Sequence, residues 1–189
     1  MKETLKSKIY REQKNHFDLY LNGYGIDIGA GDDVLEVKNG VVDEWDLSNG
    51  DAQYMIGTPN EKYDFVYSSH CLEHMHDVEQ SLMNWIRVLK SNGYLYVTVP
   101  DYILYEKLRF PSIYNPDHKN SFSVFLTRNK IKRNNHYHSD DIAKIFTKFN
   151  CKMITVELED ENFDYTIGPD VDQTRGNAQA QILFIAQKL

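Results

Sequence analysis

The stretch Tyr24–Asp33, with the sequence YGIDIGAGDD, most constrains what this chain can fold into. A short apolar run that contains the acid Asp27 ends in the turn Gly29-Ala30-Gly31. A strand followed by a glycine turn is how an open α/β sheet presents a ligand site at the carboxyl end of its first strand. Glycines accept backbone angles that other residues resist, and they let a ligand approach the chain closely. The alternative is a strand that ends in an ordinary glycine turn.

The spacing of the glycines narrows the kind of ligand. Gly25, Gly29 and Gly31 give G-x-x-x-G-x-G, whereas a dinucleotide site needs G-x-G-x-x-G leading into a helix. Asp32 and Asp33 would also place two negative charges where phosphates would lie. We therefore expect a ligand that presents an amine or hydroxyl groups rather than a pyrophosphate.

Length and charge set the broad class. A chain of 189 residues is long enough for one α/β domain, so we expect residues 1–189 to form a single domain. The net charge of -7 argues against a nucleic-acid partner, because nucleic-acid binders carry a basic excess. No apolar run approaches the roughly 20 residues of a membrane helix. Cys71 and Cys151 lack metal-like spacing and indicate free thiols in a cytoplasmic protein.

Hydrophobic periodicity predicts strands that alternate with helices. The segment 51–56 is a short edge strand or a loop, and the last two strands have no helix between them. This order predicts a Rossmann-like, mainly parallel sheet with an antiparallel carboxyl-terminal hairpin. We expect helices over 1–21, 77–90 and 139–149, and strands over 24–28, 41–46, 63–69, 94–99, 153–158 and 181–186.

Two helices carry distinct apolar faces. In the first, one broad face should hold Leu5, Ile9, Phe17, Tyr20 and Leu21. The second should be capped by Asp77 and stopped by Asn92-Gly93, and Ser139-Asp140-Asp141 should cap the third. The core-facing stripe of the second helix comprises Val78, Leu82, Trp85, Ile86 and Leu89.

Several spaced motifs resemble one enzyme family. Asp27-Ile-Gly-Ala-Gly31 resembles the D-x-G-x-G nucleotide loop of class I S-adenosylmethionine (SAM) dependent methyltransferases. Ser68-Ser-His-Cys-Leu-Glu-His74 resembles a run in the methyltransferase-11-like, small-molecule and glycan-precursor group. Arg87-Val-Leu-Lys90 followed by Asn92-Gly93, and then Pro100-Asp101, resemble further motifs of that group. The resemblance implies the seven-stranded class I methyltransferase fold and SAM as the cofactor.

The resemblance also implies residues that bind the cofactor. The carboxylate of Asp46 would accept hydrogen bonds from both ribose hydroxyls, with Asp43 and Glu44 as rivals for that role. Asp51 would accept the adenine amino group. The alternative for Asp46 and Asp51 is that they are solvated turn acids. The full expected set is Asp27, Gly29, Ala30, Gly31, Asp46, Leu47, Asp51, Ala52, Ser69 and His70.

His70 is the candidate catalytic residue. It should lie just past the carboxyl end of its strand, beside the transferred methyl group in the fold that the resemblance implies. A neutral imidazole can take a proton near pH 7, so His70 would act as a general base or would orient the acceptor. The alternatives are a structural or cofactor-contacting histidine, with catalysis supplied by alignment of the reactants alone.

The segment 102–138 has no clean periodicity and should fold over the active-site face as a lid. Its residues 102–135 hold seven basic and two acidic residues, a local charge of +5 that would attract an anionic acceptor. The alternative is a solvated lid without a charge partner. The basic residues are Lys107, Arg109, Lys119, Arg128, Lys130, Lys132 and Arg133. The expected acceptor contacts are His74, Tyr102, His118, Lys119, His136, Tyr137 and His138.

The preferred interpretation is a SAM-dependent O-methyltransferase without a metal, working as a monomer or homodimer. Its acceptor would be a small molecule, such as a sugar or a nucleotide-linked precursor of a surface polysaccharide. N-methylation of a small amine is equally compatible with the residues. A zinc hydrolase is a further alternative, because His70-x-x-Glu73-His74 matches an H-x-x-E-H pattern, with His76 or the pair His136 and His138 as a third ligand. A non-catalytic SAM-binding protein is the last.

Overall fold

The computed structural model describes residues 2–126, 131 and 133–189 of the chain. Among these residues, six strands form one sheet in the order β2-β1-β3-β4-β8-β7. The first four strands in this order are parallel, whereas β8 is antiparallel to both of its neighbours, which confirms the expected fold class. The strands are β1 (Gly23–Ile28), β2 (Gly40–Trp45), β3 (Tyr63–Ser69), β4 (Leu89–Pro100), β7 (Cys151–Glu159) and β8 (Gln181–Lys188).

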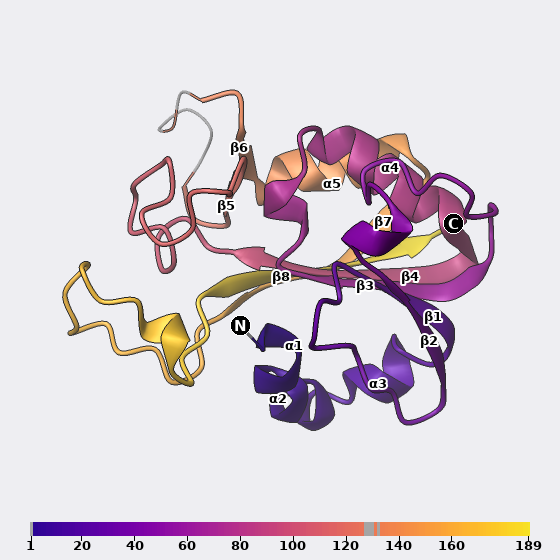
Figure 1. Cartoon of the computed structure of the whole chain (residues 1–189), viewed down its shortest axis with the longest axis horizontal. Coiled ribbons are helices and arrows are strands. Elements are labelled where there is room, and N and C mark those ends of the chain that lie inside the picture. Colours follow the sequence, from indigo (N-terminus) through magenta and orange to yellow (C-terminus); the bar gives the residue numbers. More distant parts are fainter. Residues whose placement is uncertain (1, 127–130, 132) are drawn as a thin grey trace.

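Helices cover both faces of this sheet (Figure 1). The helices α4 and α5 lie on one face, and the short helices α1, α2 and α3 lie on the other. A separate pair of parallel strands, β5 (Ser121–Ser123) and β6 (His136–His138), stands beside the main sheet. The helices are α1 (Glu3–Lys6), α2 (Lys8–Gln13), α3 (His16–Leu19), α4 (Val78–Val88) and α5 (Ser139–Lys148), with 3-10 helices at Leu47–Asn49, Leu72–His74 and Gln173–Arg175.

The two faces of the sheet have separate cores. Along β3, successive side chains alternate between the faces, because side chains of a strand point to opposite sides. Phe65 and Tyr67 pack in the core that includes Phe17, while Val66 packs in the core that includes Trp85 of α4. Since both faces are covered, β3 is buried along most of its length rather than at every second residue.

The apolar stripe of α4 is buried as the periodicity predicts. Its side chains, from Val78 to Leu89, are at most 3% exposed. Oδ1 of Asp77 accepts a hydrogen bond from the backbone N–H of Gln80 at 3.0 Å, which confirms the cap. The end of the helix differs from the expectation, because Leu89 is already extended and pairs with Tyr63 at the start of β4. Asn92-Gly93 therefore lies within the range of β4 and does not stop the helix.

The amino-terminal segment is helical but is not one helix. Asn15 adopts a left-handed backbone with φ of 58°, which ends α2 before α3 begins. The helical register of Leu5 and Ile9 therefore does not continue to Phe17. Leu5 and Ile9 are 55% and 68% exposed, whereas Phe17 is buried, so the expected shared face is wrong.

Two smaller expectations are settled by local hydrogen bonds. Residues 51–56 form a loop rather than an edge strand, since the backbone N–H groups of Tyr54 and Met55 both donate to the carbonyl of Asp51 at 3.1 Å.

The cap of α5 is His138 rather than the run that begins at Ser139. Nδ1 of His138 accepts from the N–H of Asp140, and Oδ2 of Asp141 accepts from the N–H of His138.

Candidate functional site

The carboxyl ends of β1, β2 and β3 meet at one edge of the sheet. The N–H of Gly29, just after β1, donates to the carbonyl of Trp45 at the end of β2 at 2.8 Å. Gly29 has φ of 80° and Gly31 has φ of 53°, both in the left-handed region that favours glycine. A Cβ atom added to Gly29 would lie 2.6 Å from the Cβ of Cys71, so this loop and the loop after β3 are in close contact.

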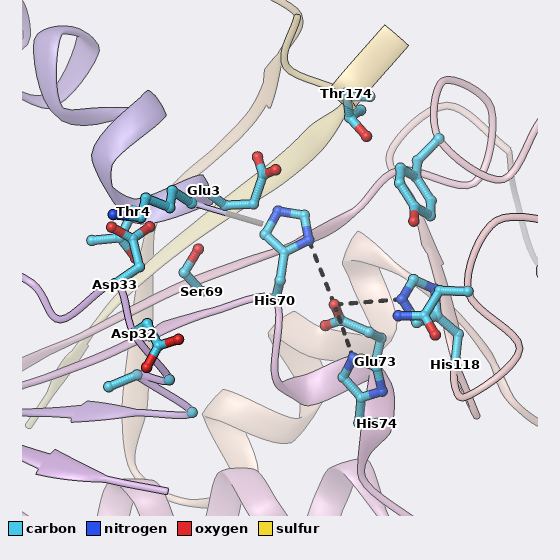
Figure 2. A pocket seen from close by; sticks show the side chains of 17 residues that line it. Glu3, Thr4, Asp32, Asp33, Ser69, His70, Glu73, His74, His118 and Thr174 are labelled. Carbon is cyan, nitrogen blue, oxygen red and sulfur yellow. Dashed lines mark ion pairs between the residues drawn. The ribbon is translucent and has the colours of Figure 1, made fainter. Parts of the chain in front are cut away.

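A cavity of about 380 Å³ opens at this edge (Figure 2). Its size falls in the range of small-molecule sites, which are roughly 300–1,000 Å³. The glycine turn forms part of its wall, and the rest comes from the end of β3 and the 3-10 helix after it, the lid, the amino terminus and the segment before β8. It is lined by Lys2, Glu3, Thr4, Gly29, Ala30, Gly31, Asp32, Asp33, Ser69, His70, Glu73, His74, Tyr105, Asn115, His118, Thr174 and Ala180. Of the residues expected from the sequence, this set contains Gly29, Ala30, Gly31, Ser69, His70, His74 and His118.

Asp27 is buried beneath the glycine turn and is not part of the cavity lining. Its Oδ2 accepts a hydrogen bond from the backbone N–H of Leu35 at 2.8 Å. Burial raises the pKa of the Asp27 carboxyl to about 7, and the hydrogen bond from Leu35 opposes that shift. The side chain therefore ties the loop that follows β1 back to its strand. That contact shapes the cavity wall without reaching the cavity.

The acids expected to bind a ribose and an adenine lie beyond the cavity lining. Oδ1 of Asp46 accepts from the N–H of Leu47 at 2.7 Å, and Asp46 caps the 3-10 helix there. Oδ1 of Asp51 accepts from the N–H of Gln53 at 2.8 Å. Both acids hold turns, and Asp46 stays partly exposed directly after β2. The carbonyl of Ala52 accepts from Nε1 of Trp85 at 2.9 Å.

The two rivals of Asp46 differ in what they contact. Oδ2 of Asp43 accepts from the hydroxyl of Tyr24 at 2.6 Å, from Nζ of Lys62 at 2.8 Å and from the hydroxyl of Tyr63 at 2.9 Å. That oxygen therefore already accepts three hydrogen bonds from side chains of the fold. Glu44 is exposed on β2. Asp46 is thus the acid that follows the strand end with a partly exposed side chain.

His70 follows β3 with a left-handed backbone, at φ of 54°. Its Nε2 lies 2.7 Å from Oε1 of Gln181, and its Nδ1 lies 3.5 Å from Oε1 of Glu73. Burial opposes the charged form, but the Glu73 carboxylate outweighs it and raises the pKa of His70 to about 9. The expected neutral imidazole at pH 7 is therefore not what this environment favours. A charged ring that donates from Nε2 to Gln181 suits an orienting role better than that of a base.

A second group of side chains closes the opposite wall. Glu73 is fully buried, and its Oε1 lies 3.9 Å from Nε2 of His74 and 3.9 Å from Nε2 of His118. Nδ1 of His74 lies 2.9 Å from Oδ2 of Asp117. Nδ1 of His118 lies 2.7 Å from Oε1 of the buried Glu106. Figure 2 shows His70, His74 and His118 converging on Glu73.

Several lid residues expected to contact the acceptor are used within the lid instead. The hydroxyl of Tyr102 donates to the carbonyl of Leu108 at 2.7 Å. His136 is buried between the hydroxyls of Ser121 and Ser123. These side chains, together with Lys119, Tyr137 and His138, are not among the residues that line the cavity, so their contact with an acceptor stays a prediction. Tyr137 stacks on Phe122, and Nε2 of His138 lies 2.7 Å from the carbonyl of Val124.

The described basic residues of the lid also lie away from the cavity lining. Arg128, Lys130 and Lys132 lie outside the described residues. Among the described ones, Arg109 lies 3.5 Å from Asp170, and Lys119 lies 3.3 Å from Asp117. Arg133 stacks over the rings of Tyr102 and Phe110. Lys107 lies over the ring of Phe163.

Sequence reasoning missed the amino terminus and the approach to β8. Glu3 and Thr4 of α1 line the cavity. Nζ of Lys6 donates to the carbonyl of Thr174 at 2.7 Å and to Glu3 at 2.9 Å, which joins these distant segments. No local motif signals such a contact between the two ends of a chain. Asp32 and Asp33 were noted for their charge but were not assigned to the site.

The H-x-x-E-H interpretation fails on geometry. It needs both histidines on one helix, one turn apart. Here a 3-10 helix spans Leu72–His74, and His70 precedes it with a left-handed backbone. Within the part of the chain that the structure describes, the group with ligand atoms within 4.8 Å of one another is Glu73, His74 and His118.

Comparison with known proteins gives a consistent picture. The model of a methyltransferase domain family matches residues 10–156. A SAM-dependent methyltransferase from Archaeoglobus fulgidus has a TM-score of 0.62 at 16% identity, covering 100% of this chain and 95% of that one. The YcgJ protein from Bacillus subtilis has a TM-score of 0.57 at 13% identity, covering 95% and 98%. A possible histamine N-methyltransferase from Thermotoga maritima has a TM-score of 0.55 at 16% identity, covering 100% of both chains.

At these identities, the likeness to solved structures shows a shared fold. None of the curated proteins matches the chain in sequence. Across the described residues, no helix combines the length and the apolar character that crossing a bilayer requires.

Proposed function

This chain belongs to the methyltransferase domain family, and we propose that it methylates a hydroxyl group of a small acceptor. It is a SAM-dependent enzyme. SAM supplies an electrophilic methyl group on a positively charged sulfur. The proposal rests on one cavity that joins the glycine turn Gly29–Gly31 to the imidazoles of His70, His74 and His118.

The residues at the glycine end fit the cofactor. A Cβ atom added to Gly31 would meet no atom within 4 Å, so the backbone there faces open space that a ligand can occupy. Asp32 and Asp33 line the same end, and their carboxylates suit an ammonium group. Asp46 follows the neighbouring strand, where its carboxylate would accept from a vicinal diol. Asp51 and Ala52 would lie beside the adenine in this arrangement.

The opposite end fits a hydroxyl-bearing acceptor. His70, His74 and His118 offer ring nitrogens that can hydrogen-bond hydroxyls, and His70 carries positive charge that suits an anionic group. A sugar, free or linked to a nucleotide as a polysaccharide precursor, has this chemistry. Tyr105, Asn115 and His118 come from segment 102–138, which supports its role as an acceptor-side lid of a single domain. Both cysteines are buried thiols, in keeping with a cytoplasmic location.

Methyl transfer at this site would depend mainly on positioning. Alignment of an acceptor oxygen with the methyl group and the sulfur lowers the activation free energy, by about 7–11 kcal/mol in favourable cases. His70 would orient the acceptor through its Nδ1 side, while its Nε2 stays on Gln181.

A second candidate is N-methylation of a small amine. Four carboxylates line the cavity, at Glu3, Asp32, Asp33 and Glu73, and together they would attract a cationic acceptor. One structural neighbour is described as a possible histamine N-methyltransferase. An amine acceptor would place its nitrogen against these carboxylates rather than against the imidazoles.

Calorimetric titration with S-adenosylhomocysteine tests the donor half of the proposal. We expect one-to-one binding that weakens at least about tenfold in Asp46→Ala, because two hydrogen bonds to the ribose are lost, at about 1 kcal/mol each. Glu44→Ala is the matched control, since it removes an exposed acid from the strand that ends just before Asp46. Equal affinities for both variants and the native protein would overturn the assignment of Asp46.

Transfer of radiolabelled methyl groups tests the acceptor half. Sugars, nucleotide-linked sugars and small primary or secondary amines are offered to the protein with labelled SAM. Label in hydroxyl acceptors supports the proposal. Label in amines alone replaces it with the second candidate.

A further inference from the structure

The carboxylate of Glu73 is buried without hydrogen-bond partners in the part of the chain that the structure describes. Its side chain is 0% exposed, and neither carboxylate oxygen has a hydrogen-bond partner among the described residues. The nearest nitrogen is Nδ1 of His70, at 3.5 Å from Oε1. A buried carboxylate without hydrogen-bond partners destabilises the folded state, because the charge has lost its water and gained nothing in return. The charged ring of His70 stands beside this carboxylate but makes no hydrogen bond to it, so the two oxygens still lack a direct partner among the described residues.

Two of the surrounding imidazoles face Glu73 with the wrong atom for a hydrogen bond. Nδ1 of His74 lies against two acceptors of Asp117, the carboxylate at 2.9 Å and the carbonyl at 3.3 Å, so it must carry the proton. Nδ1 of His118 lies 2.7 Å from the carboxylate of Glu106 and must carry its proton as well. In a neutral ring the other nitrogen is then an acceptor. Nε2 of each ring therefore turns a lone pair toward Glu73.

Three acceptor atoms thus converge on one point. They are Oε1 of Glu73 and Nε2 of His74 and His118, at 3.9 Å from Oε1 in both cases. A water molecule has two protons to donate and cannot serve three acceptors. Doubly protonated rings would not solve the problem, because 3.9 Å is too long for a hydrogen bond. A cation between the three atoms satisfies all of them at once.

We propose that Glu73, His74 and His118 bind one divalent transition-metal cation of the Zn²⁺ class, with its remaining coordination position open to the cavity. Two imidazoles and one carboxylate are the three-residue ligand set of many open zinc sites. Zinc–ligand distances of about 2.0–2.2 Å place two ligand atoms about 3.4 Å apart in a tetrahedron. The observed 3.9 Å requires each side chain to move inward by a few tenths of an ångström.

The surroundings of the three residues support a metal site. Each imidazole has its distal nitrogen fixed by a carboxylate, Asp117 for His74 and Glu106 for His118. Carboxylate–histidine–metal chains of this kind orient ligands and raise their basicity. The backbone carbonyl of Glu73 also accepts from the N–H groups of Lys119 and Asn120, which ties the lid to the ligand loop. These hydrogen bonds join two chain segments that are 46 and 47 residues apart in the sequence.

The location gives the cation a role that rests on the proposed function. All three ligands line the cavity that the glycine turn also lines. An oxygen of the acceptor would complete the coordination, and the metal would polarise that hydroxyl and hold it in place. The acceptor would then be held on the side of the cavity opposite Gly29–Gly31.

Metal binding is tested with the metal-free full-length protein. Calorimetric titration with Zn²⁺ should give one equivalent, and Co²⁺ should give the visible absorption of a four- or five-coordinate site. Glu73→Gln and His74→Ala should each weaken Zn²⁺ binding by at least about tenfold. His76→Ala is the matched control, because His76 is exposed two residues beyond the site. Circular dichroism confirms that each variant is folded, and the partly exposed His74 keeps the test valid if Glu73→Gln unfolds.

Acetohydroxamate, a small oxygen ligand, probes the open position. It should shift the Co²⁺ absorption band of the native protein. Affinity for Zn²⁺ that is absent, or unchanged in both ligand variants, overturns the proposal. Titration of the same preparations with S-adenosylhomocysteine separates the two proposals. If the protein binds S-adenosylhomocysteine but not Zn²⁺, only the proposed metal site is overturned. If it binds Zn²⁺ but not S-adenosylhomocysteine, only the proposed donor site is overturned.

Discussion

Nε2 of His70 lies 2.7 Å from Oε1 of Gln181, a residue 111 positions further along the chain. The amide nitrogen of Gln181 donates to the buried carboxylate of Glu159 and to Oγ of Ser7. Because these contacts fix the amide, its oxygen must face His70, and His70 must carry a proton on Nε2. The first residue of β8 thereby sets the protonation pattern of the candidate catalytic ring.

Replacing Gln181 should loosen the His70 ring without changing any residue that lines the cavity. In Gln181→Leu, His70 loses its hydrogen-bond acceptor and Glu159 loses a donor. We expect the free energy of unfolding to fall by about 1–3 kcal/mol, since buried polar groups are left without partners. We also expect kcat for methyl transfer to fall by about tenfold or more, because a misplaced orienting group degrades alignment. Urea unfolding and initial rates at saturating SAM measure the two effects.

Gln187→Leu is the control for this prediction. Gln187 lies on the same strand, and its amide donates to the carbonyl of Asn92 at 3.2 Å on the partly exposed side. Its replacement should change stability by no more than about 0.5 kcal/mol and leave kcat unchanged. A native rate in Gln181→Leu would show that the contact does not position His70.

The strands and the long helix could be predicted from the sequence because their signals are local. Tyr63–Ser69 is a run of seven residues with turn residues upstream, and the structure has a strand with those same bounds. The α4 stripe follows helical periodicity, and Asp77 is a capping side chain at the expected place. The prediction of one amino-terminal helix failed because Asn15 adopts a left-handed backbone, which periodicity does not reveal.

The site could be predicted only in part. The glycine turn and the strand end at Ser69–His70 were found because short motifs mark them. Glu3 and Thr174 reach the cavity through packing between the two ends of the chain, and no local pattern encodes that contact. The lid was the least predictable part. His136 and Tyr102 look like ligand-binding residues in sequence, but within the lid His136 hydrogen-bonds with Ser121 and Tyr102 donates to the carbonyl of Leu108.

The glycine turn allows a prediction that separates steric clash from backbone strain. In Gly29→Ala, the new methyl group would lie within 2.7 Å of both Cβ and Sγ of Cys71, at a positive φ. We expect a loss of about 2–4 kcal/mol in the free energy of unfolding, from overpacking together with strain. Thermal or urea unfolding measures it.

Gly31→Ala is the matched variant, because φ is also positive there but no atom lies within 4 Å of the added Cβ. It should lose only about 1 kcal/mol, from the backbone alone. Its larger effect should be on S-adenosylhomocysteine affinity, since the methyl group enters the space that the cofactor would use. Equal losses of stability in the two variants would contradict the close packing of Gly29 on Cys71.

The buried carboxyl of Asp27 makes stability depend on pH in a defined direction. Burial raises its pKa to about 7 in the folded protein, whereas an unfolded aspartate titrates near its ordinary value of about 3.9. Between these values the folded state holds a proton that the unfolded state has released. The stabilisation from this group is therefore full below about pH 4, falls as pH rises toward 7, and is constant above that. A shift of this size corresponds to at most roughly 4 kcal/mol.

Asp27→Asn should remove this dependence, because an amide does not ionise and its oxygen can still accept from the N–H of Leu35. We expect the variant to match the native protein near pH 4.5 and to be more stable than it at pH 8, by up to a few kcal/mol. Urea unfolding at the two pH values measures the difference in unfolding free energy between the variant and the native protein. Titrating groups that both proteins share contribute equally and cancel in this difference. If native and variant lose stability in parallel over this range, Asp27 is ionised in the folded protein, and its contact with Leu35 is that of a carboxylate.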